Sequence, residues 1–215
     1  MKTIIIGIAG GTGSGKSSLV NLIPRFYDAT EGTVEILGRP AADYPREALR
    51  GKVNVVMQKA QLFGGTIRSN LLWGNKDATD ADLWAALKTA QAADFVCAKP
   101  LGLDEPVEQG GRNLSGGQKQ RLCIAVACMK DTDVICFDEP TSGLDYTSMK
   151  NVSALLHELS EAGKTLLVTS HDYEFLMSTC THICYLKAGH VEDYFEVQKE
   201  TAFKIYRILF QKEDE

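Results

Sequence analysis

The sequence lacks any apolar run that approaches the roughly 18 to 20 residues needed to span a bilayer. Its opening, residues 1–6, is too short and too quickly followed by glycines to serve as a signal peptide. We therefore expect a cytoplasmic chain, which becomes peripheral at a membrane only where a partner takes it there.

An excess of basic residues is also absent. The chain has 23 Lys and Arg against 28 Asp and Glu, a formal net charge of -5 and a pI near 5.5. Proteins whose main role is to bind nucleic acid usually carry a clustered positive surface. We therefore expect no nucleic-acid partner.

No CxxC pair occurs among the six cysteines, and several of them lie in apolar runs. Reduced thiols packed in a core are the expected state. Cys180, His182 and Cys184 would share one face of a strand, but no fourth ligand is nearby. Zinc prefers a closed set of four ligands, so this trio is a weak candidate for a metal site.

Four short runs rich in β-branched residues are apolar on both faces: 4–8, 53–57, 134–137 and 165–169. Such runs are typical of central strands that are covered on both sides. Helical patterns lie between them, the clearest with Met149, Val152, Leu155, Leu156 and Leu159 on one face. Strands that alternate with helices predict an α/β fold with a doubly wound, mostly parallel sheet.

Three regions depart from this alternation. Residues 33–37 and 183–194 have the pattern of a reduced antiparallel sheet at one edge. Strand signals vanish from 70 to 129, where we expect a helical subdomain inserted into a single domain of residues 1–215, whose core comprises 1–69 and 130–215. The tail from about 197 predicts a helix, followed by a frayed charged end at 212–215.

Residues 10–17, GGTGSGKS, fit the P-loop pattern G-x-x-x-x-G-K-[ST] and lie between a predicted strand and a predicted helix. Backbone amides of such a loop surround phosphate oxygens, Lys16 reaches the outer phosphates, and the Ser17 hydroxyl binds Mg2+. An ordinary glycine turn is the alternative, and it would need neither flanking element. We expect ATP to be bound by Gly10, Gly11, Thr12, Gly13, Ser14, Gly15, Lys16, Ser17 and Ser18.

A second apolar strand, 134–137, ends in Asp138 and Glu139. Ligands bind at the carboxyl ends of strands in doubly wound sheets. This pattern predicts a Walker B strand, in which Asp138 holds Mg2+ and Glu139 orients and deprotonates the attacking water. A pair of acids that caps a turn before Pro140 is the alternative, and the P-loop upstream disfavours it.

Residues 114–118, LSGGQ, form a turn that leads into another apolar helix, and so make a second phosphate-seeking helix start. One nucleotide has no obvious need for two such sites on one subunit. Here the chain resembles the ABC ATPase family, whose signature is LSGGQ. The resemblance implies that Ser115, Gly116, Gly117 and Gln118 close over ATP held by the P-loop of another subunit, in a homodimer or a heterodimer with a second ABC ATPase.

Other parts of the family pattern follow in order and extend the resemblance over nearly the whole chain. Gln58 matches the glutamine that senses the metal and couples to a membrane-spanning transport subunit. Asp145, in SGLD, resembles the residue that touches the other subunit, and His171 resembles the switch histidine at the γ-phosphate. The resemblance implies a P-loop NTPase with a RecA-like core and Mg2+-dependent ATPase activity. It also implies that the catalytic residues are Lys16, Gln58, Glu139 and His171, and that the residues at the metal are Ser17, Gln58 and Asp138.

The sequence departs from the family pattern in two respects. Members carry an adenine-stacking aromatic residue well before the P-loop, whereas this chain begins fifteen residues before Lys16, so weaker and less selective base binding is expected. Its segments also resemble different relatives: 1–17 uridine kinases, 19–127 exporter ATPases, and the part from about 128 the ATPases of vitamin and metal importers. This pattern suggests a mosaic, recombined or designed chain.

Two other functions stay open at this point. A small-molecule kinase, similar to uridine kinases, would use the P-loop but would have no need of residues 114–118. A recombined scaffold that binds nucleotide with little turnover would carry every motif without the activity. Phosphate release from ATP distinguishes the leading prediction from the scaffold.

Overall fold

The computed structural model describes residues 4–11, 13–58, 61–130 and 132–210. Its centre is a six-stranded sheet in the order β10-β9-β1-β8-β7-β4, in which β10 alone runs antiparallel to its neighbour. The strands are β1 (Ile5–Ala9), β4 (Val53–Val56), β7 (Val134–Asp138), β8 (Thr165–Thr169), β9 (His182–Lys187) and β10 (His190–Glu196). The four predicted central strands and the mostly parallel sheet are therefore confirmed.

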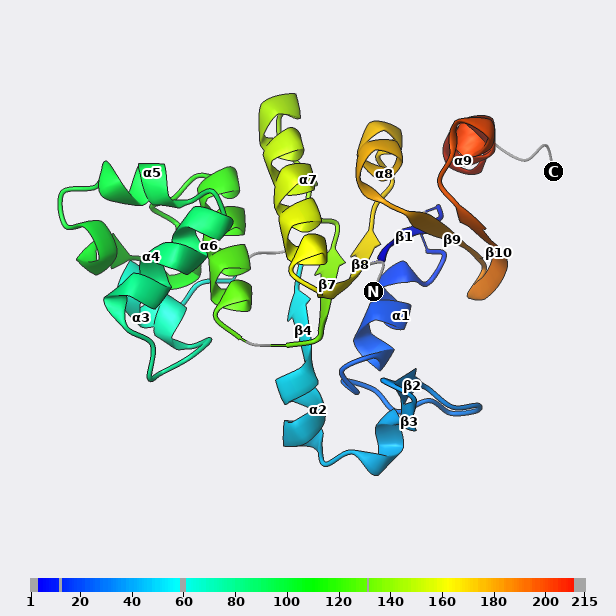
Figure 1. Cartoon of the computed structure of the whole chain (residues 1–215), viewed down its shortest axis with the longest axis horizontal. Coiled ribbons are helices and arrows are strands. Elements are labelled where there is room, and N and C mark those ends of the chain that lie inside the picture. Colours follow the sequence, from blue (N-terminus) through cyan, green and yellow to red (C-terminus); the bar gives the residue numbers. More distant parts are fainter. Residues whose placement is uncertain (1–3, 12, 59–60, 131, 211–215) are drawn as a thin grey trace.

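Helices cover both faces of this sheet, as Figure 1 shows. One face packs against α1 (Lys16–Leu22) and α2 (Arg46–Lys52), where Val20 and Leu49 join a buried cluster with Cys136. The other face packs against α7 (Tyr146–Glu161), α8 (Tyr173–Thr179) and α9 (Ala202–Phe210). Because both faces are covered, every residue of β7 is buried, which accounts for its continuous apolar sequence.

Four helices gather beside α7, away from the P-loop side of the sheet (Figure 1): α3 (Ile67–Leu72), α4 (Asp80–Thr89), α5 (Ala93–Cys97) and α6 (Gly116–Cys128). They occupy most of the segment that was expected to be helical. That segment is not free of strands, however, because β6 (Pro106–Val107) pairs with β5 (Gly65–Thr66). Two-residue strands have no periodicity of their own, so only the long-range pairing reveals them.

The expected antiparallel edge consists of two separate ladders. The β9–β10 hairpin is confirmed, but it extends the main sheet, since β9 also pairs with β1. In contrast, β2 (Glu35–Ile36) pairs with β3 (Arg39–Pro40) as a sheet of its own. Single turns of 3₁₀ helix lie at η1 (Ala41–Asp43), η2 (Gly102–Asp104), η3 (Gln109–Gly111) and η4 (Lys199–Thr201). The tail helix is confirmed as α9, while 211–215 lie outside the described residues.

Candidate nucleotide-binding site

A cavity of about 610 Å³ lies at the carboxyl end of β1. This volume is within the range typical of small-molecule sites. The P-loop residues 10, 11 and 13–18 line it together with Gln58, Glu139 and His171, and α9 adds Ile208 and Leu209. The structure thus brings together residues from five separate parts of the sequence. Thr12, which was also predicted here, lies outside the described residues.

The P-loop has the backbone shape that a phosphate cradle needs. Gly13 and Gly15 have φ values of 80° and 95°, in the left-handed region that favours glycine. Gly15 is the residue before α1, and no side chain in the described part of the chain caps that helix, so the first amides of α1 have no side-chain acceptor there. The Oγ of Ser14 is buried, and no described residue forms a hydrogen bond with it. Both features leave donors available to an anion.

Lys16 supplies the positive charge of the site. Its Nζ donates to the carbonyl oxygens of Gly10 at 2.5 Å and Gly11 at 3.4 Å, and it lies 4.0 Å from Oε1 of Glu139. The ammonium group is therefore held over the P-loop itself. It also faces the carboxylate that was predicted to act on water.

Asp138, at the end of β7, is held by two hydroxyl groups. The Oγ1 of Thr169 donates to its Oδ1 at 2.7 Å, and the Oγ of Ser17 donates to the same oxygen at 3.3 Å. Hydroxyl and carboxylate oxygens are the ligands that Mg2+ prefers, so Ser17 and Asp138 fit that ion. Sequence reasoning missed Thr169, whose only signal was its place as the last residue of a predicted strand.

Glu139 lies just beyond the strand, in a strained conformation. Its φ of 49° is in the left-handed region, which costs a residue other than glycine about 1 to 2 kcal/mol. Its amide donates to the Oγ1 of Thr169 at 2.8 Å and to the carbonyl of Thr169 at 3.2 Å, which fixes this turn. Strain of this kind is concentrated at functional sites. The carboxylate is directed toward His171, whose Nδ1 lies 2.9 Å from Oε2.

The signature residues do not line the P-loop cavity. Ser115 precedes α6 and its Oγ accepts from the amide of Gln118 at 3.2 Å, while Oε1 of Gln118 accepts from the amide of Ser115 at 3.1 Å. Gly116 lines a second cavity, of about 340 Å³, which shares Gln58 with the first. Gln58 therefore lies between the P-loop and the start of α6.

Asp145 also lies outside the P-loop cavity. It caps α7, because its Oδ1 accepts from the amide of Ser148 at 2.8 Å. Hydrogen bonds from Ser148, the backbone amide first, lower the pKa of Asp145. A contact of Asp145 with another subunit stays a prediction.

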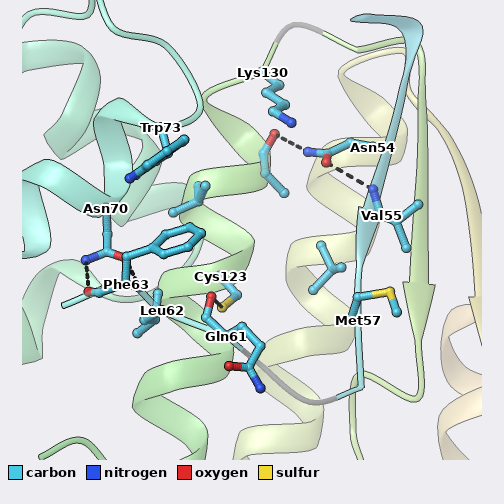
Figure 2. A pocket seen from close by; sticks show the side chains of 13 residues that line it. Asn54, Val55, Met57, Gln61, Leu62, Phe63, Asn70, Trp73, Cys123 and Lys130 are labelled. Atoms are coloured by element: carbon cyan, nitrogen blue, oxygen red, sulfur yellow. Dashed lines mark hydrogen bonds between the residues drawn. The ribbon is translucent and has the colours of Figure 1, made fainter. Parts of the chain in front are cut away.

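A third cavity, of about 290 Å³, separates β4 from α3 and α6. Figure 2 shows Phe63 and Trp73 on one side of it and Met57 on the other. The rings of Phe63 and Trp73 stack with centroids 4.8 Å apart, and they are 52% and 66% exposed. Asn70 positions this wall, since its side chain bonds both the amide and the carbonyl of Phe63. The sequence did not predict this cavity, and its only signal there was the presence of two aromatic residues, Phe63 and Trp73.

Two kinds of feature are absent from the described part of the chain. Within residues 4–11, 13–58, 61–130 and 132–210, no three His, Cys, Asp or Glu side chains are grouped as metal ligands. None of the described helices has the length and apolarity needed to cross a bilayer.

Cys180 is buried, which raises the pKa of its thiol to about 12.

Comparison with known proteins agrees with this geometry. A family model described as "ABC transporter" matches residues 2–142, and one described as "AAA domain, putative AbiEii toxin, Type IV TA system" matches 112–178. The ATP-dependent lipid A-core flippase of Burkholderia orbicola is 44% identical over 87% of this chain. The uncharacterized ABC transporter ATP-binding protein YwjA of Bacillus subtilis is 42% identical over 77%.

A solved structure of a bacterial Atm1-family ABC exporter with ATP bound superposes on all of this chain, with a TM-score of 0.88 and 28% identity. The chain covers 31% and 29% of the two relatives and 38% of that exporter chain, so it spans about a third of each. The chain therefore belongs to the ABC transporter family, as an ATPase domain. The family model crosses both expected joins without a break, which gives no support to a mosaic origin.

Proposed function

We propose that this chain binds ATP with Mg2+ in the P-loop cavity and hydrolyses it as one member of a head-to-tail pair. The observation that carries the proposal is the meeting of Lys16, Glu139 and His171 in one cavity. A phosphate-binding cation, a carboxylate able to accept a proton from water and a histidine beside it are the groups that the reaction needs.

Each group has a separate task in this proposal. Lys16 moves from the P-loop carbonyls to the outer phosphates, because phosphate oxygens are stronger acceptors for an ammonium group. Glu139 orients the attacking water and accepts its proton. His171, hydrogen-bonded to Glu139, holds the γ-phosphate. Mg2+, held by Ser17 and Asp138 with Gln58 nearby, supplies charge neutralisation when it is bound.

The pairing is proposed because the chain separates its two phosphate-binding helix starts. Ser115, Gly117 and Gln118 lie outside the P-loop cavity, so they serve a nucleotide on another subunit, either a second copy or another ABC ATPase. Residues 70–129, which carry this signature, are proposed as the helical subdomain, and 1–69 with 130–215 as the RecA-like core. Asp145, capping α7, is proposed to face that partner.

ATP binding and hydrolysis are proposed to drive a membrane-spanning transport partner, with the chain peripheral on the cytoplasmic side. Support comes from the cavity in Figure 2, where exposed Phe63 and Trp73 offer an apolar wall beside Gln61 and Leu62, which follow Gln58 closely in sequence. An apolar segment of the partner that enters this cavity would move the loop carrying Gln58. The ATP site and the transport partner would then be coupled through one short stretch of chain.

Phosphate release from ATP in the presence of Mg2+ tests the proposal. The parent should turn over, whereas Glu139→Gln should bind ATP with near-parent affinity and release phosphate at least about a hundredfold more slowly. Lys16→Ala should instead lose ATP affinity in calorimetry. Turnover that survives Glu139→Gln would remove this residue as the base. A parent that binds ATP without turnover would favour the inactive scaffold.

A further inference from the structure

The helix α9 forms one wall of the nucleotide cavity. Of the thirteen described residues that line this cavity, eight lie within residues 10–18, three are Gln58, Glu139 and His171, and the other two are Ile208 and Leu209. These two supply its only large aliphatic side chains among the described residues. None of the described lining residues is a phenylalanine, tyrosine or tryptophan.

The position of α9 is fixed by packing. Ile205 is fully buried, and Ile208 and Leu209 follow it at spacings of three and four residues, so all three share one face of the helix. On one side of α9, Lys204 forms an ion pair with Asp193. The face that anchors the helix therefore continues into the cavity.

Aromatic contacts join the end of α9 to the loop that carries the switch histidine. The ring of Tyr173 lies 6.1 Å from that of Tyr206 and 6.5 Å from that of Phe210. Tyr173 is the first residue of α8, two residues after His171. These contacts thus fix the position of α9 relative to His171.

A nucleotide has two chemically different parts, and the cavity has two matching kinds of lining. The triphosphate needs amides and cations, which the P-loop and Lys16 provide. The base has flat, largely apolar faces. Their transfer from water to contact with aliphatic carbon is favourable. We propose that Ile208 and Leu209 form the surface against which the base of the bound nucleotide packs, and so help to set base affinity.

This inference rests on the proposed function, and its test separates the two. Binding of Mg-ATP and of Mg-inorganic triphosphate, which has no base, is measured by calorimetry. The double variant Ile208→Ala/Leu209→Ala should bind ATP about tenfold more weakly than the parent, while inorganic triphosphate should stay within about twofold. Leu209→Met, which keeps an apolar side chain of similar volume, should retain ATP affinity within about threefold.

Phe203→Ala is the matched control, because Phe203 lies on the same helix, is 67% exposed and does not line the cavity. It should bind both ligands as the parent does. If the double variant binds ATP as tightly as the parent, the inference is wrong. If it loses both ligands equally, α9 only supports the P-loop, and the inference is again wrong. A parent that binds no ATP would instead reject the proposed function.

Discussion

The Nδ1 atom of His171 lies 2.9 Å from Oε2 of Glu139, although 32 residues separate them in sequence. They meet because β7 and β8 are adjacent and parallel, so the residues after their carboxyl ends are neighbours. The contact joins the proposed base to the proposed γ-phosphate sensor. It also gives each group a partner before any nucleotide arrives.

His171→Ala should therefore reduce phosphate release by about a hundredfold, since both the orientation of Glu139 and the γ-phosphate contact are lost. His157→Ala is the control, because this exposed histidine lies on α7 outside the nucleotide cavity. Steady-state phosphate release measures both variants. Equal rates for His171→Ala and the parent would exclude a catalytic part for this histidine.

Thr169→Val should destabilise the protein by about 1 to 3 kcal/mol, because it removes a fully buried hydroxyl that donates to Asp138 and accepts from the amide of Glu139. Thr165→Val makes the same chemical change at the exposed start of the same strand and should alter stability by less than about 0.5 kcal/mol. Urea unfolding gives both values. Similar values for the two variants would contradict the assigned role of the Thr169 hydroxyl.

Gly7→Ala should cost about 1 to 3 kcal/mol, since an added Cβ in β1 would lie 2.7 Å from Leu176 Cδ2 and 2.8 Å from both Cys180 Sγ and Ile183 Cδ1. Gly51→Ala is the opposite case. A Cβ added to Gly51, which lies in α2, would meet no neighbour within 4 Å among the described residues, so lower chain entropy in the unfolded state should raise stability by up to about 1 kcal/mol. Thermal unfolding should shift in opposite directions for the two variants.

In the Glu139→Gln background, ATP with Mg2+ should convert the monomer to a dimer, whereas ADP should not, because in the proposed pair only the γ-phosphate would reach the signature residues of the opposing subunit. Ser115→Arg should abolish this dimer and leave ATP binding to the monomer nearly unchanged. Sedimentation measures whether each protein is a monomer or a dimer.

Thr79→Arg is the control for that variant, because Thr79 caps α4 with the same paired hydrogen bonds that Ser115 makes at α6. It loses an equivalent cap, worth about 1 kcal/mol, away from the proposed interface, and should still dimerise. A monomer at saturating ATP in the Glu139→Gln background alone would reject the paired mechanism.

The sequence by itself determined the parts of this protein whose physics is local. A glycine-rich turn between a strand and a helix needs only contiguous residues, so the loop at 10–17 could be predicted, as could the apolar strand that ends at Asp138. The β-branched runs likewise predicted the central strands, because burial on both faces leaves a continuous apolar pattern.

Only the tertiary structure decided which distant groups meet. The hydroxyl of Thr169 beside Asp138, the pairing of β5 with β6, and the placement of Ile208 and Leu209 against the P-loop all depend on contacts between segments far apart in sequence. None of these leaves a periodic signal, because a single side chain or a two-residue strand has no repeat. Their positions follow from how the strands are ordered in the sheet and how α9 packs on α8, and both are set by the buried core as a whole.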